Sequence, residues 1–217
     1  SNGVHHGAFR HEMGDKSLSS EQGWQMDLSY SLCLGICDIS ISPFYSYYPH
    51  YIALQPTGQW SMLPDAGQVY RYTDAPTTLA GGELHIKARL WRNMHYTFAG
   101  EYVHTYDHSS HTATSFSPPA TMRNTISWDA AVWQCFMECQ SVAPQNRVCH
   151  NEDKTSGYNL FHIGGSVDFQ FSKSKLSLLL HISNLFDTSY LNHLNFYRRI
   201  ELPEAGIDIQ STIRLTF

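Results

Sequence analysis

Ile207-Asp208-Ile209-Gln210-Ser211-Thr212-Ile213-Arg214-Leu215-Thr216-Phe217 ends the chain and alternates apolar or small side chains with polar ones. Successive residues of a β-strand point to opposite faces, so one face is apolar and the other polar. Eleven residues also match the roughly 9–11 that a tilted strand needs to cross a membrane. Taken alone, the segment fits a strand of a transmembrane barrel or an amphipathic strand of a soluble sandwich.

The composition favours the membrane. Aromatic residues make up 13% of the 217 residues, with 13 Tyr, and charged residues only 15%. A soluble surface is normally richer in charge, whereas Tyr and Trp gather at the two interfaces of a membrane barrel. No run approaches the ~20 apolar residues of a membrane helix. The net charge of −5 provides no basic surface for nucleic acid.

Eight further segments show the same alternation, which predicts an all-β protein with nine strands. The clearest is Leu84, Ile86, Ala88 and Leu90 against Glu83, His85, Lys87 and Arg89. The run from Cys135 to Val148 is less regular. The eight segments are 24–32, 39–45, 84–90, 96–102, 122–128, 135–148, 163–171 and 176–182.

The connectors alternate between short and long. Short ones are expected near 33–37, 91–93, 133–134 and 172–175, and long ones near 48–70, 106–120, 149–157 and 188–205. Outer-membrane barrels have short periplasmic turns and longer extracellular loops. The pattern therefore predicts an antiparallel transmembrane β-barrel with all long loops outside the cell.

Nine is an odd number, and single-chain bacterial barrels have an even number of strands. A nine-stranded sheet would leave two unpaired edges in lipid, where each unsatisfied backbone group is costly. We therefore expect residues 1–217 to be the C-terminal portion of a larger barrel. Residues 207–217 should pair with 176–186 on one side and with a strand outside this chain on the other. Ser1–His6 lacks a signal-peptide pattern, which fits a removed leader or a longer precursor.

Several stretches, in chain order, resemble the TonB-dependent outer-membrane receptors. They are Gly3–Gly7, Arg10–Asp15, Leu18–Glu21, Ser42–Tyr45, Leu54–Gly58, Gly81–Glu83, Pro118-Pro119, Ala143–Arg147, Gly157-Tyr158 and Asn184–Asp187 with Tyr190. The resemblance implies a barrel of about 22 strands filled by a plug. It also implies the inner-membrane partner TonB, which grips an N-terminal box. Neither plug, box nor the N-terminal strands are recognised in this sequence, so energy coupling would lie outside it.

Histidine is frequent, with 13 residues. Imidazole is a good ligand for zinc, copper, iron or haem iron. The early stretch with His5, His6 and His11 resembles a subgroup that includes zinc receptors, and is the predicted metal site. His104, His108 and His111 are the predicted ligand-binding residues. Zinc, haem or an iron siderophore is expected as cargo, with no required cofactor. Each histidine taken singly also fits an ordinary polar surface residue.

Cys33 and Cys37 flank the turn Leu34-Gly35-Ile36. Antiparallel neighbours can bring two Cα atoms within the ~4.4–6.8 Å of a disulfide, so a bridge is predicted as a possibility. Cys135 and Cys139 would lie about 13 Å apart on one strand, too far to bond.

The sequence thus predicts part of an energy-coupled importer of a metal or metal chelate, in the outer membrane of a Gram-negative bacterium. Its partners would be outer-membrane lipid, the remaining strands and plug, and TonB. The alternatives are a passive porin-like or structural barrel and a surface adhesin. No Ser-His-Asp or paired-carboxylate arrangement indicates an enzyme.

Overall fold

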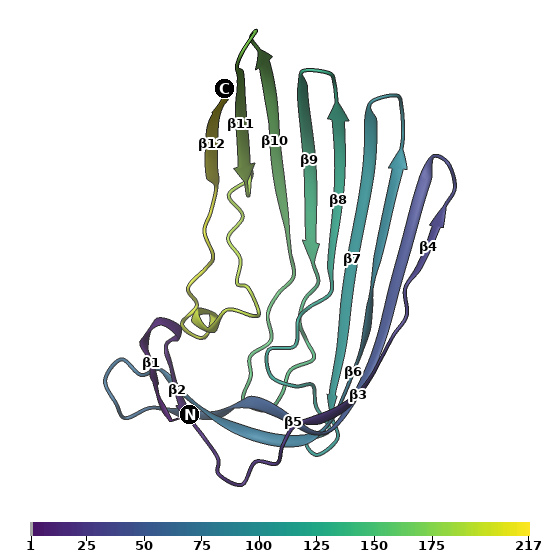
Figure 1. Ribbon diagram of the computed structural model, residues 1–217. Helices are drawn as coiled ribbons and strands as arrows, with labels where there is room; N and C mark the ends of the chain where they lie inside the picture. Colours follow the sequence, from purple (N-terminus) through teal and green to yellow (C-terminus); the bar gives the residue numbers. More distant parts are fainter. Residues whose placement is uncertain (1) are drawn as a thin grey trace.

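The computed structural model describes residues 2–217, whose long strands form one curved antiparallel sheet (Figure 1). Its first strand has two pieces, β3 (Gln22–Asp27) and β4 (Tyr30–Cys33), and both pair with β5 (Cys37–Trp60). Each later strand pairs with the next in sequence. These are β6 (Gln68–Arg89), β7 (Met94–Asp107), β8 (Thr121–Asp129), β9 (Trp133–Val142), β10 (Tyr158–Gln170), β11 (Lys175–Ser183) and β12 (Asp208–Thr216).

With β3 and β4 counted as one, the sheet contains the nine predicted strands. It is open, with β3/β4 at one edge and β12 at the other. The predicted partner of the last strand is confirmed, since Leu176 pairs with Leu215 and Ile182 with Ile209. On its other side β12 has no neighbouring strand among residues 2–217.

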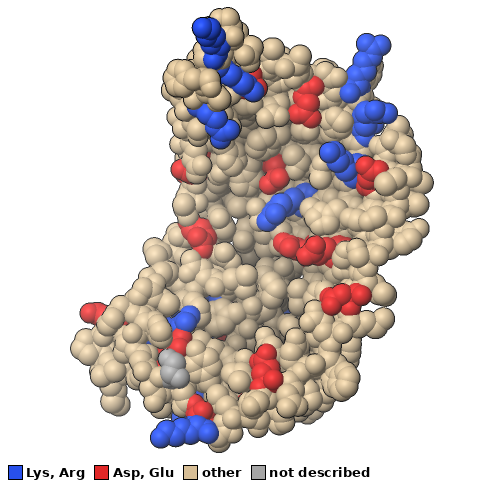
Figure 2. Space-filling model, in the orientation of Figure 1, with Lys and Arg blue, Asp and Glu red and all other residues tan. Residues whose placement is uncertain are grey.

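The register separates the side chains into two faces, because directly paired residues point to the same side. The apolar face includes Ile39, Ile41, Leu84, Ile86, Tyr96, Phe98, Met122, Ile126, Met137, Ile163, Leu178, Leu180, Ile209 and Ile213. The polar face includes Asp38, Glu83, His85, Lys87, Glu101, Arg123, Glu138, His162, Asp168, His181 and Arg214. Figure 2 shows charged side chains scattered over the middle of the visible surface.

The four tight turns lie at one end of the sheet and the longer connections at the other, called here the turn end and the loop end (Figure 1). The turns span 34–36, 90–93, 130–132 and 171–174, and the longer connections 61–67, 108–120, 143–157 and 184–207. The long loop predicted at 48–70 is wrong, because β5 and β6 continue their pairing to Trp60 and Gln68. Register shifts after Tyr48 and Pro56 let this hairpin continue past its neighbours.

A small N-terminal hairpin lies at the loop end. It consists of β1 (Gly3–His5), the 3-10 turn η1 (His6–Ala8) and β2 (Arg10–Met13). β2 runs parallel to the start of β6, where Arg10 pairs with Gln68 and Met13 with Arg71. A second 3-10 turn, η2 (Phe196–Ile200), lies in the last loop. Across residues 2–217, no helix has the length and apolar character needed to span a membrane.

The possible disulfide between Cys33 and Cys37 is not formed, and both thiols are free. The register gives the reason, because Cys33 pairs with Asp38 while the Cys37 carbonyl accepts from the Leu34 N–H. Cys33 therefore shares the polar face with Asp38. Cys37 pairs with Ala88 and points to the apolar face, so the two sulfurs lie on opposite sides of the sheet.

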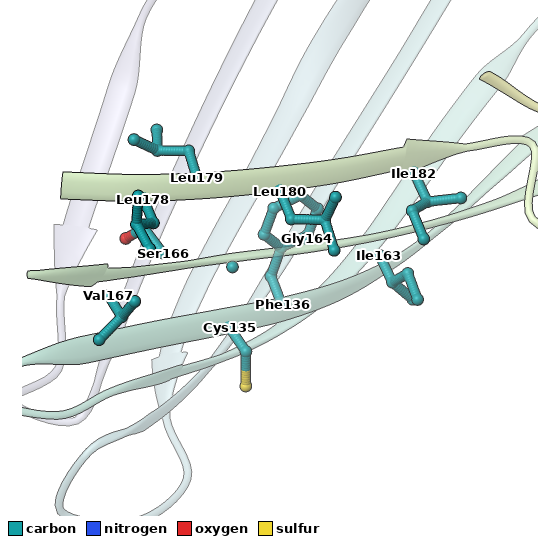
Figure 3. A pocket seen from close by; sticks show the side chains of 11 residues that line it. Cys135, Phe136, Ile163, Gly164, Ser166, Val167, Leu178, Leu179, Leu180 and Ile182 are labelled. Carbon is teal, nitrogen blue, oxygen red and sulfur yellow. The ribbon is translucent and has the colours of Figure 1, made fainter. Parts of the chain in front are cut away.

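Adjacent glycines interrupt the side-chain rows of β10. A Cβ at Gly164 would lie 2.5 Å from the Phe136 ring, so only glycine lets this ring lie against the strand on the polar face. Beside it, the missing side chain of Gly165 leaves an apolar hollow of about 460 Å³ (Figure 3). Leu180 and Cys135, which flank Gly165 in the register, border this hollow.

Side-chain burial is concentrated at the loop end, because a sheet one layer thick has no interior of its own. Buried apolar residues there include Ala66, Val69, Tyr70, Ala113 and Cys149. Buried polar residues are more numerous and include Glu12, Asp107, Glu152, His193 and Arg198. The connections therefore pack into a second structural unit with its own hydrogen-bonded core.

Candidate functional site

A pocket of about 340 Å³, lined by both polar and apolar side chains, lies on the polar face beneath the loops. Strands β5 to β10 and the last loop contribute to it, and its polar side chains include Glu83, Glu101, Arg123, Gln140, Tyr158 and Asn192. The side chains of Pro118 and Pro119 from the 108–120 connection form part of its rim. The strands thus contribute the charged groups of the pocket, and the loops form its outer wall.

Glu83 and Glu101 are directly paired residues of β6 and β7. Directly opposed side chains have Cβ atoms only ~4.5–5.5 Å apart, and like charges at such positions repel. Among residues 2–217, the basic side chain within 4.0 Å of these carboxylates is His85, whose Nε2 lies 3.5 Å from Glu83. Arg123 borders the same pocket from β8. The pocket therefore presents two close carboxylates and one guanidinium to whatever occupies it.

The loops above this pocket are tied together at Glu152. One carboxylate oxygen, Oε1, accepts from Arg198 Nη2 at 2.6 Å and from the Phe116 N–H at 2.9 Å. The other oxygen, Oε2, accepts from the Cys149 N–H and thiol, each at 3.3 Å. Arg198 belongs to the 184–207 loop and Phe116 to the 108–120 loop, so one carboxylate joins three connections.

His193 completes this cluster. Its Nδ1 lies 3.0 Å from the Thr155 hydroxyl, and its Nε2 lies 3.5 Å from Glu152 Oε1, a long contact. The side chain is 1% exposed. The Arg198 guanidinium also donates to the His193 carbonyl. Imidazole, carboxylate and guanidinium are thus buried together and satisfy most of one another's hydrogen bonds.

This environment changes the acidity of two groups. Burial alone would raise the pKa of Glu152, but the adjacent His193 ring, the hydrogen bond from the Phe116 N–H and the charge of Arg198 lower the pKa to about 2. Burial, the Glu152 charge and the hydrogen bond to Glu152 raise the pKa of the Cys149 thiol. The cluster therefore holds a carboxylate and a neutral thiol at neutral pH, which excludes Cys149 as a ready thiolate.

An aromatic group surrounds the ion pair and reaches the N-terminal hairpin. Phe116 and Phe196 have ring centroids 4.3 Å apart, and Tyr70 of β6 lies 5.5 Å from Phe196. Arg198 lies over Phe116 at 4.9 Å, and Arg10 of β2 lies over Phe196 at 4.2 Å. Stacking of this kind fixes η2 between the hairpin and the loops.

The predicted metal site at His5, His6 and His11 is not formed. His5 pairs with Arg10 and His11 with Val4 in the hairpin, so their side chains point to opposite faces. His5 Nε2 contacts Glu12 at 3.3 Å, His11 Nδ1 contacts the Ser61 hydroxyl at 3.0 Å, and His6 lies in η1. Residues 2–217 contain no group of three or more His, Cys, Asp or Glu placed to hold a metal ion.

The predicted ligand residues His104, His108 and His111 lie near one another in sequence but have different partners. His108 Nε2 lies 2.9 Å from the Thr78 hydroxyl, and its ring is 4.9 Å from that of Tyr106. His111 Nδ1 lies 3.1 Å from the Tyr106 hydroxyl. His104 instead contacts Arg147, and its pairing with Ala80 places it on the side of the apolar face. A role for them in binding cargo stays a prediction.

The sequence did not predict that Glu152, His193 and Arg198 form one cluster, or that the polar residues of the pocket lie together. Glu152 is five residues from Arg147 in the Ala143–Arg147 stretch that carries the family resemblance, but Arg198 has no motif around it. Their pairing joins residues 46 positions apart and depends on how two irregular loops fold. Glu83 and Glu101 were recognised as residues of the polar face, and only the register shows that they are direct neighbours.

Comparison with known proteins identifies the fold. A family model described as "TonB dependent receptor-like, beta-barrel" matches residues 2–185. The solved structure of "Copper transporter OprC" superposes with a TM-score of 0.79 at 22% identity, over 91% of this chain and 31% of that one. The siderophore receptor PirA from Acinetobacter baumannii gives 0.67 at 14% identity, over 94% and 33%.

A third structure, a ferric enterobactin receptor mutant from Pseudomonas aeruginosa, gives a TM-score of 0.67 at 16% identity, over 94% of this chain and 32% of that one. This chain thus spans about a third of the length of these proteins. No curated protein matches the sequence. The family match covers most of the chain and the superpositions share its sheet, so the chain belongs to the TonB-dependent receptor family and forms part of its β-barrel.

Proposed function

We propose that this chain forms part of the wall and outer loops of an outer-membrane importer for a metal ion or metal chelate. The observation that carries the proposal is the division of the sheet into an apolar and a polar face, within a member of this receptor family. In this assignment the apolar face contacts lipid and the polar face lines the lumen. The long connections then face outward from the cell.

The cargo class rests on chemistry and on the relatives. The solved structures that superpose on this chain include a protein titled as a copper transporter and others titled as siderophore receptors. The paired carboxylates Glu83 and Glu101 suit a cargo with positive charge or exposed metal coordination sites. Copper, zinc, haem and iron siderophores are the cargo candidates, and no enzymatic activity is proposed.

Energy coupling would come from parts that this chain does not include. A plug within the completed barrel and TonB in the inner membrane are the proposed partners, together with outer-membrane lipid and the remaining strands. The buried Glu152 cluster supports a receptor over an open pore, because it holds three loops in one packed unit above the lumen. A passive porin-like barrel would need an unobstructed channel.

Uptake measurements test this function. Cells of the source organism with the gene deleted should lose uptake of one radiolabelled cargo, supplied as copper, zinc, haem or an iron siderophore, and growth should fail when that cargo is limiting. The same uptake should stop in wild-type cells treated with a protonophore. Uptake that persists with the protonophore would instead identify a passive pore, and normal uptake of all four cargoes in the deletion strain would contradict the proposal.

A paired variant tests the pocket. The double substitution Glu83→Gln and Glu101→Gln should lower affinity for a cationic cargo by tenfold or more, since both carboxylates face the pocket. Asp38→Asn is the matched control, because it removes a carboxylate from the polar face at the turn end. Equal affinity in the double variant and wild type would move the cargo site elsewhere in the receptor.

A further inference from the structure

From the turn end to Tyr102, the apolar face of β7 and of its paired neighbours carries no formal charge. On β7 its positions are Met94, Tyr96, Phe98, Gly100 and Tyr102. Their neighbours on β6 and β8 are equally uncharged, and the one amide among them, Asn124, accepts a hydrogen bond from Tyr96 at 2.7 Å. A face of this kind contacts hydrocarbon without an energetic penalty from buried charge.

The first ionisable side chain of the apolar face on β7 is His104, and a cation joins it there. Arg147, from the 143–157 loop, contacts His104 Nδ1 at 2.7 Å and Nε2 at 3.1 Å, and donates to the Tyr102 hydroxyl at 3.3 Å. Tyr102 is 46% exposed. Within 4.0 Å, Arg147 has no Asp or Glu partner among residues 2–217, unlike Arg10, Arg198 and Arg199.

The local strand pairing explains how a loop residue reaches this face. β8 pairs with β7 only as far as Glu101 and Thr121, and the next bridge on that side joins Asp107 to Thr112, so β7 has no strand partner there from Tyr102 to Tyr106. Arg147 donates to the Thr105 carbonyl on this edge at 2.9 Å. All of its partners are therefore neutral, and its positive charge stays uncompensated by the protein.

The position of the cluster matches a membrane boundary. Met94 pairs with Trp128 near the turn end, and His104 follows ten residues later on the same face. Ten residues at ~3.3 Å and a tilt of about 40° span roughly 25 Å along the membrane normal, the height of the apolar band of a barrel. Trp128 would lie at one border of that band, and Tyr102, His104 and Tyr106 at the other.

We propose that Arg147, His104 and Tyr102 form a binding site on the outside of the barrel for the phosphate headgroup of an anionic membrane lipid. The guanidinium supplies the charge and the Tyr102 hydroxyl supplies a further donor, while the His104 ring accepts from Arg147 and holds the guanidinium in place. The acyl chains of the same lipid lie against Phe98 and Met122 of the apolar face. The inference rests on the proposed membrane placement, and it identifies a lipid contact on the face of the sheet opposite to the carboxylates Glu83 and Glu101.

Native mass spectrometry of the full-length receptor tests the site. The receptor is released from mixed micelles with equal amounts of phosphatidylglycerol and phosphatidylcholine that carry the same acyl chains. Wild type should retain phosphatidylglycerol over phosphatidylcholine by fivefold or more. Arg147→Gln should reduce that ratio towards one, and Arg147→Lys should keep most of it, because a cation remains at the boundary.

Lys87→Gln is the matched control, since it removes one cation from the polar face of the neighbouring strand, and it should leave the ratio unchanged. His104→Asn provides a second variant that keeps the Arg147 contact to the Thr105 carbonyl, and it should lower the ratio in a correctly folded barrel. The site is wrong if the phosphatidylglycerol to phosphatidylcholine ratio is unchanged in Arg147→Gln, or if it falls equally in Lys87→Gln.

A free-anion arm separates the two sources of phosphate. Inorganic phosphate at 20 mM should not displace the retained phosphatidylglycerol, because the acyl chains hold the lipid on the apolar face. Displacement would show a simple anion site and contradict the lipid assignment. A receptor that retains neither lipid would contradict the proposed membrane placement. Equal retention of both lipids would contradict only the headgroup site.

Discussion

The Glu152 carboxylate and the Arg198 guanidinium form an ion pair of 2.6 Å in which each side chain is 2% exposed or less. Glu152→Gln should loosen the loop end, because removing one partner of a buried pair costs about 3–5 kcal/mol locally. We expect faster hydrogen exchange in segments 108–120, 143–157 and 184–207, with little change in the strands. Asp153→Asn is the control, because Asp153 is the next residue and its side chain is exposed. Hydrogen exchange that stays slow in both variants would show that the Glu152–Arg198 pair does not stabilise the loops.

Acid should loosen the same loops. The pKa of Glu152 is lowered from the ordinary 4.5 of a glutamate to about 2, so the folded loops favour the charged carboxylate. A lowered pKa adds stability above pH 4.5 that is lost as the pH falls towards 2. Hydrogen exchange in the 143–157 loop, corrected for intrinsic rates, should therefore rise over this range. In Glu152→Gln the rise should be weaker, and an identical profile would assign the effect to other carboxylates.

The glycine beneath Phe136 should tolerate no side chain. Gly164→Val places atoms within 2.5 Å of the Phe136 ring and should cost about 1–3 kcal/mol of unfolding free energy, since overpacking forces side chains off their rotamers. Urea unfolding in lipid vesicles measures this. Adding Phe136→Ala should recover part of the loss, because it removes the colliding ring. A double variant no better than the sum of the two single variants would reject this contact.

Charge on the two faces should have opposite consequences. Phe98→Arg puts a cation on the apolar face and should destabilise the inserted barrel by about 2–4 kcal/mol, if Phe98 lies near the midplane. The adjacent Thr97→Arg points to the polar face and should be tolerated. Folding efficiency into vesicles, followed by heat-modified migration on gels, compares them. Equal tolerance of both arginines would argue against the lipid-facing assignment.

The five cysteines should all react as thiols. The structure contains five free cysteines, with Cys33 and Cys37 on opposite faces. Alkylation of the denatured, unreduced receptor, followed by mass spectrometry of peptides from this chain, should modify all five. Cys149 should react last in the folded receptor because it is buried. If Cys33 and Cys37 instead stay unmodified and their peptide mass is lower by two hydrogens, the two residues form a disulfide.

The strands could be predicted from sequence because their signal is local. Alternation such as that of Leu84, Ile86 and Ala88 requires only the two-residue period of a strand, and it located all nine strands and the partner of β12. The prediction failed at 48–70, which was expected to be a long loop and contains Pro49, Pro56 and Gly58. The β5–β6 hairpin accommodates these residues through register shifts, since the long pairing on either side fixes the backbone.

The loop-end sites could not be predicted in the same way. Contacts such as Arg198 with Glu152, or Arg147 with His104, join irregular segments whose paths have no periodicity. The histidines were prominent in the sequence, yet the hairpin register separates His5 from His11. Residue chemistry thus indicated which groups are available, whereas backbone pairing decided which of them meet.

The sequential order of the strands also shapes how the chain folds. From β5 to β12 every strand adds to the one before it, so hairpins can form one after another with short loop closures. The N-terminal hairpin breaks this order, because β2 attaches to β6 and the Tyr197 hydroxyl donates to the Gly7 carbonyl, 190 residues away. Among the hydrogen bonds of residues 2–217, this one closes the longest loop, so the hairpin should dock late, after the wall of strands has assembled.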